Sequence, residues 1–195
     1  MIRVNEIFHS LQGEGYHSGT AAVFLRLSGC NLRCPFCDTD HADGTLMTED
    51  EAAKATSQWP TPLVVVTGGE PALQLNTCLI DALHRHGKRI AVETNGTLSL
   101  PDGIDWITLS PKDLFLGDAA NPIITEADEL KVVFDGKHLP HDYSHISIRH
   151  ARFLQPCDTG DDVLNQRITS ATVDYIKSHP QWRLSLQIHK ILNIR

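Results

Sequence analysis

Long apolar runs and an excess of basic residues are both absent from this 195-residue sequence. No segment approaches the roughly 18 uninterrupted apolar residues that a membrane-spanning helix requires, and the first residues lack the basic stretch and apolar core of a signal peptide. We therefore expect a cytoplasmic protein without a membrane partner. Lys and Arg total 17 against 24 Asp and Glu, a net charge of -7. Because nucleic-acid binders usually present a basic face, we expect no nucleic-acid partner.

Internal repeats, low-complexity segments and linkers are also missing. The length suffices for one domain with a sizeable buried core, so we expect a single domain over residues 1–195. A composition that is 41% apolar and 21% charged is ordinary for a globular protein. The acidic balance fits an enzyme that acts on small molecules.

Cysteine is scarce and unevenly placed. Three of the five cysteines, Cys30, Cys34 and Cys37, fall within eight residues. In a cytosolic chain such crowding indicates a metal site rather than disulfides. Cys78 and Cys157 stand apart, and the simplest interpretation of both is a small buried apolar side chain.

The order of apolar segments predicts an α/β protein with a mostly parallel sheet. Strands that alternate with helices imply right-handed crossovers. About six such units are too few for a closed eight-stranded barrel, so an open, partial (β/α)6-like barrel is expected. The expected strands cover residues 22–27, 63–67, 89–93, 106–109, 129–134, 151–155 and 182–187, the expected helices cover 48–59, 72–86 and 163–178, and a long loop is expected over 112–127.

Polar and glycine-rich groups follow the expected strands one after another. Cys30 follows the first strand, and the next three strands precede Gly68-Gly69-Glu70, Thr94-Asn95-Gly96 and Ser110-Pro111-Lys112. In α/β architectures ligands bind at the carboxyl ends of parallel strands. These groups therefore predict one active site at that edge.

The cysteine loop by itself fits two kinds of metal site. Three thiolates suit an iron–sulfur cluster, and a [4Fe–4S] cluster would keep one iron without a protein ligand. His41 lies four residues after Cys37, so a closed structural zinc site with three cysteines and one histidine is the alternative. A zinc-stabilised binding module without catalysis is the corresponding rival function.

Two motifs together resemble the radical S-adenosylmethionine (SAM) superfamily. The cysteine loop has the spacing Cys-x3-Cys-x2-Cys with Phe36 before the last cysteine, and Thr67–Pro71 reads Thr-Gly-Gly-Glu-Pro. Further segments, from one end of the chain to the other, resemble the 7-carboxy-7-deazaguanine synthase family. These segments are 11–15, 37–39, 93–97, 110–112, 155–156 and 182–195, with Leu-Gln-Gly-Glu-Gly and the C-terminal Leu-Gln-x-His-Lys as the most specific.

The resemblance implies a function. The protein would be a carbon–nitrogen lyase that converts 6-carboxy-5,6,7,8-tetrahydropterin to 7-carboxy-7-deazaguanine and ammonia by radical ring contraction, in 7-deazapurine biosynthesis leading to queuosine. Its cofactors would be a [4Fe–4S] cluster, SAM and Mg2+. A homodimer and a flavodoxin-like electron donor are also implied. Another small radical SAM enzyme of comparable length, such as an activase that installs a glycyl radical on a partner, is the rival within the superfamily, but it gives no reason for Leu-Gln-Gly-Glu-Gly or for the apolar C-terminal segment.

Site roles follow from the same resemblance, position by position. Cys30, Cys34 and Cys37 match the cluster ligands, and Thr39 matches a magnesium ligand. The substrate contacts would be Leu11, Gln12, Gly13, Glu14, Arg26, Thr67, His189 and Arg195. The SAM contacts would be Gly69, Glu70, Ser110, Pro111, Lys112, Gln155, Pro156, Cys157 and Asp158.

The apolar C-terminal segment carries one more expectation. Apolar residues recur between Leu184 and Ile194, whereas most termini are polar and frayed. The segment is therefore expected to pack against the core, and the resemblance implies that the carboxylate of Arg195 reaches the amino-bearing ring of the pterin.

Overall fold

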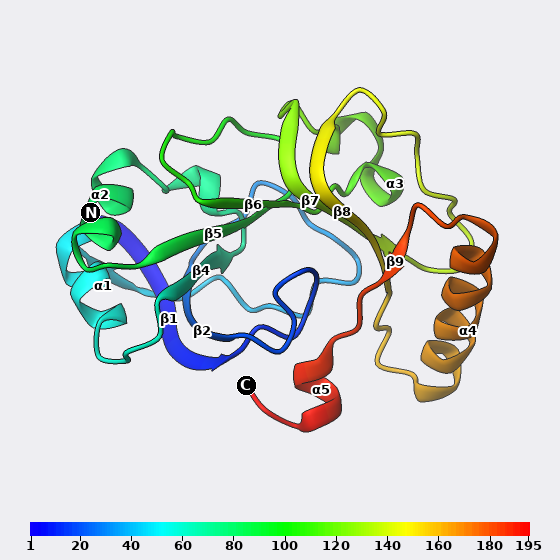
Figure 1. The fold of residues 1–195 in the computed structure, drawn as a ribbon, viewed down its shortest axis with the longest axis horizontal. Coiled ribbons are helices and arrows are strands. Elements are labelled where there is room, and N and C mark those ends of the chain that lie inside the picture. Colours follow the sequence, from blue (N-terminus) through cyan, green and yellow to red (C-terminus); the bar gives the residue numbers. More distant parts are fainter.

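The computed structural model describes residues 1–195 as one nine-stranded sheet in the order β3-β1-β2-β4-β5-β6-β7-β8-β9 (Figure 1). All neighbouring strands from β2 to β9 are parallel, while β1 is antiparallel to β2 and β3. The strands are β1 (Ile2–Leu11), β2 (Ala21–Leu27), β3 (Thr45–Met47), β4 (Leu63–Gly68), β5 (Arg89–Thr94), β6 (Trp106–Leu109), β7 (Glu126–Phe134), β8 (Ser147–Pro156) and β9 (Arg183–Leu184). The expected α/β fold with an open, mostly parallel sheet is confirmed.

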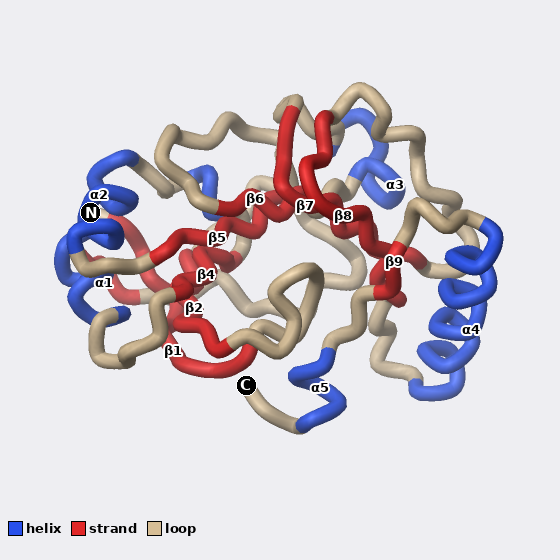
Figure 2. Tube along the Cα trace, in the orientation of Figure 1, coloured by secondary structure: helices blue, strands red, loops and turns tan.

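The chain has five α-helices, which do not follow every strand. They are α1 (Glu49–Thr56), α2 (Thr77–Arg85), α3 (Asp113–Leu116), α4 (Asp162–Ser178) and α5 (Ile188–Leu192), with short 3-10 helices η1 (Pro71–Leu73) and η2 (Gly117–Ala120). The crossovers from β5 to β6 and from β7 to β8 contain no helix (Figure 2). The sequence likewise indicated no helix between these strands. No helix combines the length and apolar character that a membrane span requires.

Local signals explain where the longer elements begin. Thr48 caps α1 in a capping box with Glu51, as its position in the sequence predicts. The expected helix over 72–86 is instead divided, because η1 ends at Leu73 and Asn76 caps a new helix that begins at Thr77. Gly87 follows the C-cap His86 with φ +70°, the left-handed conformation that glycine adopts most easily.

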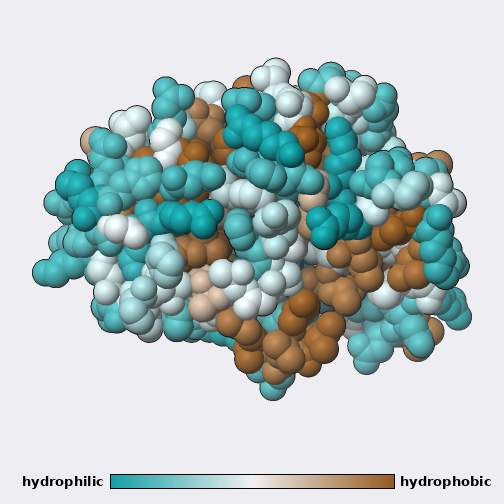
Figure 3. Space-filling view, viewed as in Figure 1, coloured by the Kyte–Doolittle hydropathy of each residue, from teal (hydrophilic) through white to brown (hydrophobic).

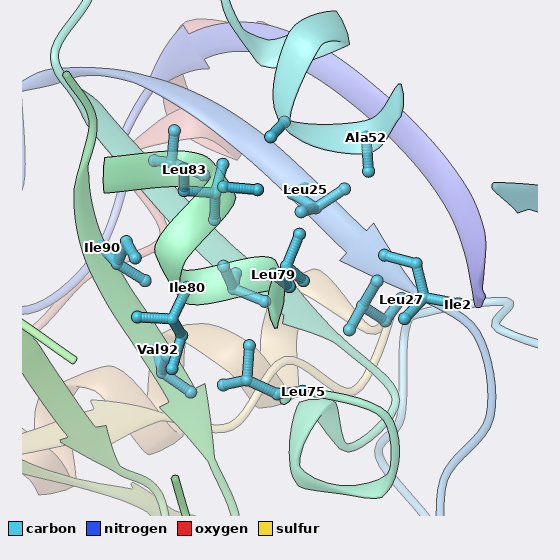
Figure 4. Close-up of a cluster of buried hydrophobic side chains, with 14 of the residues drawn as sticks. Ile2, Leu25, Leu27, Ala52, Leu75, Leu79, Ile80, Leu83, Ile90 and Val92 are labelled. Carbon is cyan, nitrogen blue, oxygen red and sulfur yellow. The ribbon is translucent and has the colours of Figure 1, made fainter. Parts of the chain in front are cut away.

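Alternation along the parallel strands divides their side chains between two environments. In β4, Val64 and Val66 pack under α1 and α2 in a core of 16 buried residues, the largest in the protein (Figure 4). Leu63 and Val65 face the other way, into a smaller apolar cluster on the inner face of the curved sheet. Thr67 continues this inner row beyond the apolar cluster. The inner face is thus apolar at the amino ends of the strands and polar at their carboxyl ends.

The two ends of the chain differ from expectation. Residues 2–11, which showed no clear strand pattern, form β1, whose pairing with β2 shifts register between Val4 and Glu6. The strand expected over 182–187 is only two residues long, and α5 follows it. The apolar side chains of α5 do not pack inward, because Ile191 is 69% exposed and Leu192 53% exposed. Figure 3 shows the resulting apolar patch over α5.

Candidate active site

A cavity of about 670 Å³ opens at the carboxyl edge of the parallel strands. Every site residue expected from the sequence lines it except Glu70 and Pro111. The expected residues in the lining are Leu11, Gln12, Gly13, Glu14, Arg26, Cys30, Cys34, Cys37, Thr39, Thr67, Gly69, Ser110, Lys112, Gln155, Pro156, Cys157, Asp158, His189 and Arg195. Residues from the whole length of the chain therefore converge on one site.

The inner rows of the strands deliver these side chains. Arg26 follows Ala22 and Phe24 at two-residue spacing in β2, and Glu93 follows Ala91 in β5. In β7, Leu130 and Val132 belong to a second core of nine buried residues on the outer face of the sheet, which we call the outer core. Lys131, between them, therefore faces inward to the cavity. Charged residues within otherwise apolar strands are thus explained by the cavity they line.

The cysteine loop lies between β2 and β3, with all three thiols free. Phe36 packs edge-on against Phe115 of α3, at 4.6 Å between ring centroids. Burial raises the pKa of the Cys30 and Cys34 thiols, while the nearby Lys112 ammonium acts in the opposite direction. Bound iron would favour the thiolate over the thiol. The loop thus presents three unpaired thiols to the cavity.

The geometry bears on the zinc alternative. No three His, Cys, Asp or Glu side chains lie together as ligands of a single metal ion. A mononuclear zinc site needs all its sulfurs about 2.3 Å from one ion, whereas the cysteines of a four-iron cluster bind different irons and lie farther apart. The cysteine side chains thus do not form a preassembled site for one ion.

Gly68 and Gly69 allow the loop after β4 to approach the cysteine loop. A Cβ atom on Gly69 would lie 2.0 Å from the carbonyl oxygen of Gly29 and 2.8 Å from Cβ of Cys30. A Cβ atom on Gly68 would lie 2.0 Å from the oxygen of Leu27. The contact between the two loops therefore requires glycine at both positions, because any side chain would collide with the backbone at the end of β2 or in the cysteine loop.

Glu70 was expected to contact SAM, but it lies outside the cavity lining. Its side chain is 1% exposed and accepts hydrogen bonds from the amide of Asn95 at 2.7 Å, from the hydroxyl of Thr94 at 2.8 Å and from the amide of Ala72 at 3.0 Å. The carboxylate is therefore directed into the protein and not at the cavity. Asn95 in turn donates to Asn31 of the cysteine loop at 3.1 Å, so Glu70 holds the loop after β5 against the cysteine loop. Pro111 is buried and also lies outside the lining.

Apart from Gly69 after β4, the expected SAM contacts that line the cavity lie in the loop after β6, at the end of β8 and in the loop after β8. The Lys112 ammonium donates to the carbonyl and hydroxyl oxygens of Ser110 at 2.5 and 2.7 Å, and burial lowers its pKa. The amide oxygen of Gln155 accepts from the Ser185 hydroxyl at 2.9 Å. Cys157 is buried, as expected, whereas Cys78 is exposed on α2, contrary to expectation.

Arg26 and Thr39 lie together on the opposite side. The guanidinium of Arg26 donates to Glu6 at 2.8 Å and to the hydroxyl of Thr39 at 3.3 Å. Arg195 also pairs with Glu6, and its guanidinium lies over the ring of Phe8, 5.0 Å from the centroid. Two of the expected substrate residues, Arg26 and Arg195, therefore lie in the same polar part of the site as the expected magnesium ligand Thr39.

The C-terminal segment closes the side of the cavity between the two ends of the open sheet. The amide of Ile188 donates to the oxygen of Gly13 at 3.1 Å, and the hydroxyl of Ser10 donates to the terminal carboxylate of Arg195. Lys190 pairs with Asp38 at 2.8 Å and with Asp158 at 2.6 Å, and its ammonium, with backbone and Asn165 donors, lowers the pKa of Asp158 to about 2. Figure 1 shows this segment passing from β9 back toward the first strands. It therefore forms part of the wall of the cavity.

The sequence analysis assigned no role to several residues that line the cavity or pair with its lining, because their roles depend on partners far away in the sequence. Glu6, Glu93, Lys131, Gln187 and Lys190 pair with other site residues. One signal was available. A lysine inside an apolar strand is almost never buried without an acidic partner, and Lys131 stands in such a strand.

Known proteins are similar to this chain over its whole length. A family model described as the radical SAM superfamily matches residues 25–114. The 7-carboxy-7-deazaguanine synthase of Bacteroides thetaiotaomicron is 51% identical, covering 100% of this chain and 100% of the relative, and that of Nitratidesulfovibrio vulgaris is 44% identical, covering 98% of each. The crystal structure of QueE from Escherichia coli has a TM-score of 0.70 at 26% identity and covers 95% of this chain and 93% of that one. With this similarity from end to end, and with the cysteine loop and glycine loop at one cavity, the chain belongs to the 7-carboxy-7-deazaguanine synthase family of radical SAM enzymes.

Proposed function

We propose that this protein converts 6-carboxy-5,6,7,8-tetrahydropterin to 7-carboxy-7-deazaguanine and ammonia. The supporting observation is the cavity, which brings the three cysteines of the radical SAM loop to the same space as Arg26, Gln12 and Glu14. The atoms of the substrate equal those of the two products, so the reaction is an elimination of ammonia with no net oxidation. The chain therefore needs no stoichiometric oxidant for its reaction.

Cys30, Cys34 and Cys37 would hold a [4Fe–4S] cluster, and the adjacent backbone at Gly69 would adjoin SAM. When bound, the reduced cluster and SAM supply the radical that starts the ring contraction. The side chains supply binding and orientation. Arg26 offers a fixed guanidinium to the pterin carboxylate, and Glu14 and Gln12 offer acceptors and donors to the ring.

Magnesium belongs to this proposal because of the oxygen atoms around Thr39. A smaller cavity of about 310 Å³ is lined by Asn5, Glu6, Arg26, Asp38, Thr39 and Asp40, all polar. A hard cation takes oxygen ligands, and a threonine hydroxyl is a weak ligand alone. The substrate carboxylate and water would supply further oxygens beside Thr39.

Four further parts of the proposal concern the working form of the protein. Residues 1–195 act as one domain, a second copy of the chain covers the apolar patch over α5, and a flavodoxin-like protein delivers electrons to the cluster. We also place the reaction in the cytoplasm, where thiols stay reduced. Light scattering at several concentrations tests the dimer, and a monomer at all of them would contradict it.

The decisive experiment uses anaerobically reconstituted, reduced protein with SAM and the pterin. The expected product differs from the substrate by the loss of one ammonia and absorbs as a deazapurine. The product is followed by mass spectrometry, and a heat-treated sample serves as the control. Cleavage of SAM without any change in the mass of the pterin would overturn the proposal.

A further inference from the structure

Lys131 is a buried charged residue to which the proposed function gives no role. It lies in the middle of β7 and is only 4% exposed. Its neighbours Leu130 and Val132 enter the outer core, so its side chain extends along the inner face to the wall of the cavity. A buried ammonium is costly unless it is paired, and its partners indicate what it does.

Two cavity-lining carboxylates contact the ammonium of Lys131. It forms an ion pair with Glu14, from the loop after β1, and a second pair with Glu93 at the end of β5, at 3.4 Å. The Glu14 side chain is 14% exposed and that of Glu93 is 24% exposed. The two carboxylates therefore come from different parts of the fold, pair with the same ammonium and still line the cavity.

Amide side chains fix the orientation of the same two carboxylates. Gln12 donates to Glu93 at 3.0 Å, and Gln187 donates to Glu14 at 3.0 Å. The amide of Glu14 donates to the side-chain oxygen of Gln12 at 3.1 Å. The network thus connects β1, β5, β7 and the C-terminal segment around a single ammonium.

We propose that Lys131 is a positioning residue that holds Glu14 and Glu93 as paired hydrogen-bond acceptors for the N–H edge of the substrate ring. This inference rests on the proposed function, because an aminopyrimidinone ring carries adjacent N–H donors that suit two carboxylates. Because Glu14 and Glu93 share one ammonium, their carboxylate oxygens are not all occupied by Lys131 and can accept hydrogen bonds from the substrate. In this role Lys131 would act on the substrate through the two carboxylates.

The titration behaviour of Glu14 gives the role a specific signature. Burial alone would raise the pKa of Glu14, but Lys131, Gln187 and His189 outweigh it and lower the pKa below the usual value. Burial likewise opposes the charge on Lys131, and Glu14, Glu93 and Glu129 overcome it, so its pKa is raised. Lys112 is the remaining charged group that acts on Lys131. Without Lys131 the burial effect on Glu14 would dominate, and the carboxylate would take up a proton at a higher pH.

The test compares Lys131→Met with Lys88→Met. Lys88 is also buried, at 6% exposed, but it donates only to the carbonyls of Trp59 and Thr61, away from the cavity. Pterin binding is measured by calorimetry on reconstituted protein without reductant, at several values between about pH 6 and about pH 8, and KM and kcat are measured on reduced protein. His189 is present in every variant, so the wild type is the reference for its contribution.

For Lys131→Met we expect the pterin Kd to rise about 10- to 100-fold, with normal cluster content and a smaller change in kcat. The Kd should rise further as the pH falls, because Glu14 takes up a proton, whereas the wild-type Kd should stay flat. Adding Glu14→Gln to Lys131→Met should remove this pH dependence while the Kd stays high. Lys88→Met should lower the melting temperature and leave the binding profile unchanged.

Three results would overturn the role of Lys131. These are a wild-type Kd in folded Lys131→Met at all pH values, the same pH-dependent weakening in Lys88→Met, or a pH-dependent Kd in the double variant. If Lys131→Met does not fold, Lys131→Arg retains the charge and should bind the pterin with a flat pH profile, and a steep profile would contradict the proposal. Failure of the wild type to convert the pterin would count against the proposed function instead.

Discussion

Gly13 and His189 are in direct contact in the wall of the cavity, although they come from opposite ends of the chain. A Cβ atom on Gly13 would lie 2.3 Å from Nδ1 of His189, and the neighbouring amide of Ile188 donates to the oxygen of Gly13. The Leu-Gln-Gly-Glu-Gly segment and the C-terminal Leu-Gln-x-His-Lys segment therefore form one surface. Only glycine leaves room for the imidazole at this place.

Gly13→Ala should therefore displace His189 and weaken substrate binding. We expect KM for the pterin to rise at least about tenfold, because a misplaced binding group costs 1.4 kcal/mol or more, while the cluster content stays normal. Gly87→Ala is the control for a loss of stability without a collision, since a Cβ atom there meets nothing within 4 Å but stands at a φ of +70°, a strained backbone conformation that Gly13 does not adopt. Steady-state kinetics on both variants decide the matter, and an unchanged KM in Gly13→Ala would contradict the contact's importance.

Replacing any cysteine of the loop should abolish turnover. Cys30→Ala, Cys34→Ala and Cys37→Ala each remove one ligand of a cluster that has only three from the protein. Cys78→Ala and Cys157→Ala should keep the cluster, because Cys78 is exposed on α2 and Cys157 follows β8. Iron content and visible absorbance are the measurements. Loss of iron in Cys157→Ala with a normal cluster in Cys34→Ala would refute the assignment.

Magnesium should stimulate turnover through Thr39. Thr39→Ala removes the hydroxyl that now accepts from Arg26, so the stimulation should fall several-fold, while Thr39→Ser should keep most of it. Because the substrate carboxylate completes the oxygen ligands, magnesium affinity should depend on the pterin. Titration of metal-depleted protein measures both effects. Equal activity with a chelator and with magnesium would eliminate this site.

Glu70→Gln tests the correction that places this carboxylate inside the protein. The substitution puts an NH2 group opposite the donors of Ala72, Thr94 or Asn95, so it should cost about 1–3 kcal/mol in the free energy of unfolding. SAM affinity should fall only through movement of the loop after β5. Glu126→Gln is the control, because Glu126 is in an exposed pair with Arg149 that contributes less than about 1 kcal/mol. Weaker SAM binding with unchanged stability would instead support direct contact.

The parallel strands were predictable because burial on both faces gives short, nearly continuous apolar runs. β6 matches its expected range, and β2, β4 and β5 are each one residue longer than expected. β1 was missed because the register shift between Val4 and Glu6 interrupts its alternation. Phe8 then lines the main cavity and Glu6 the smaller polar one, so a half-buried strand carries an irregular pattern.

Sequence motifs identified most residues of the candidate site. They did not identify the ion pairs that hold these residues in place. A motif identifies residues that share a loop, whereas Lys131 pairs with Glu14 across the fold and Lys190 joins Asp38 to Asp158. The C-terminal apolar run was interpreted as core because hydropathy does not distinguish a buried strand from an exposed patch. Such distinctions depend on which surface is already covered.

The order of the strands has a consequence for how the chain folds. From β5 to β9 each strand pairs with the strand before it in the sequence, so this part of the sheet grows by closing loops that are much shorter than the chain. Contact between Gly13 and Ile188 closes a loop of nearly the whole chain and carries a larger entropy cost. We therefore expect the sheet to form first and the substrate-binding wall last. In pulse-labelled hydrogen exchange, the amides of β4 and β5 should gain protection before the amide of Ile188.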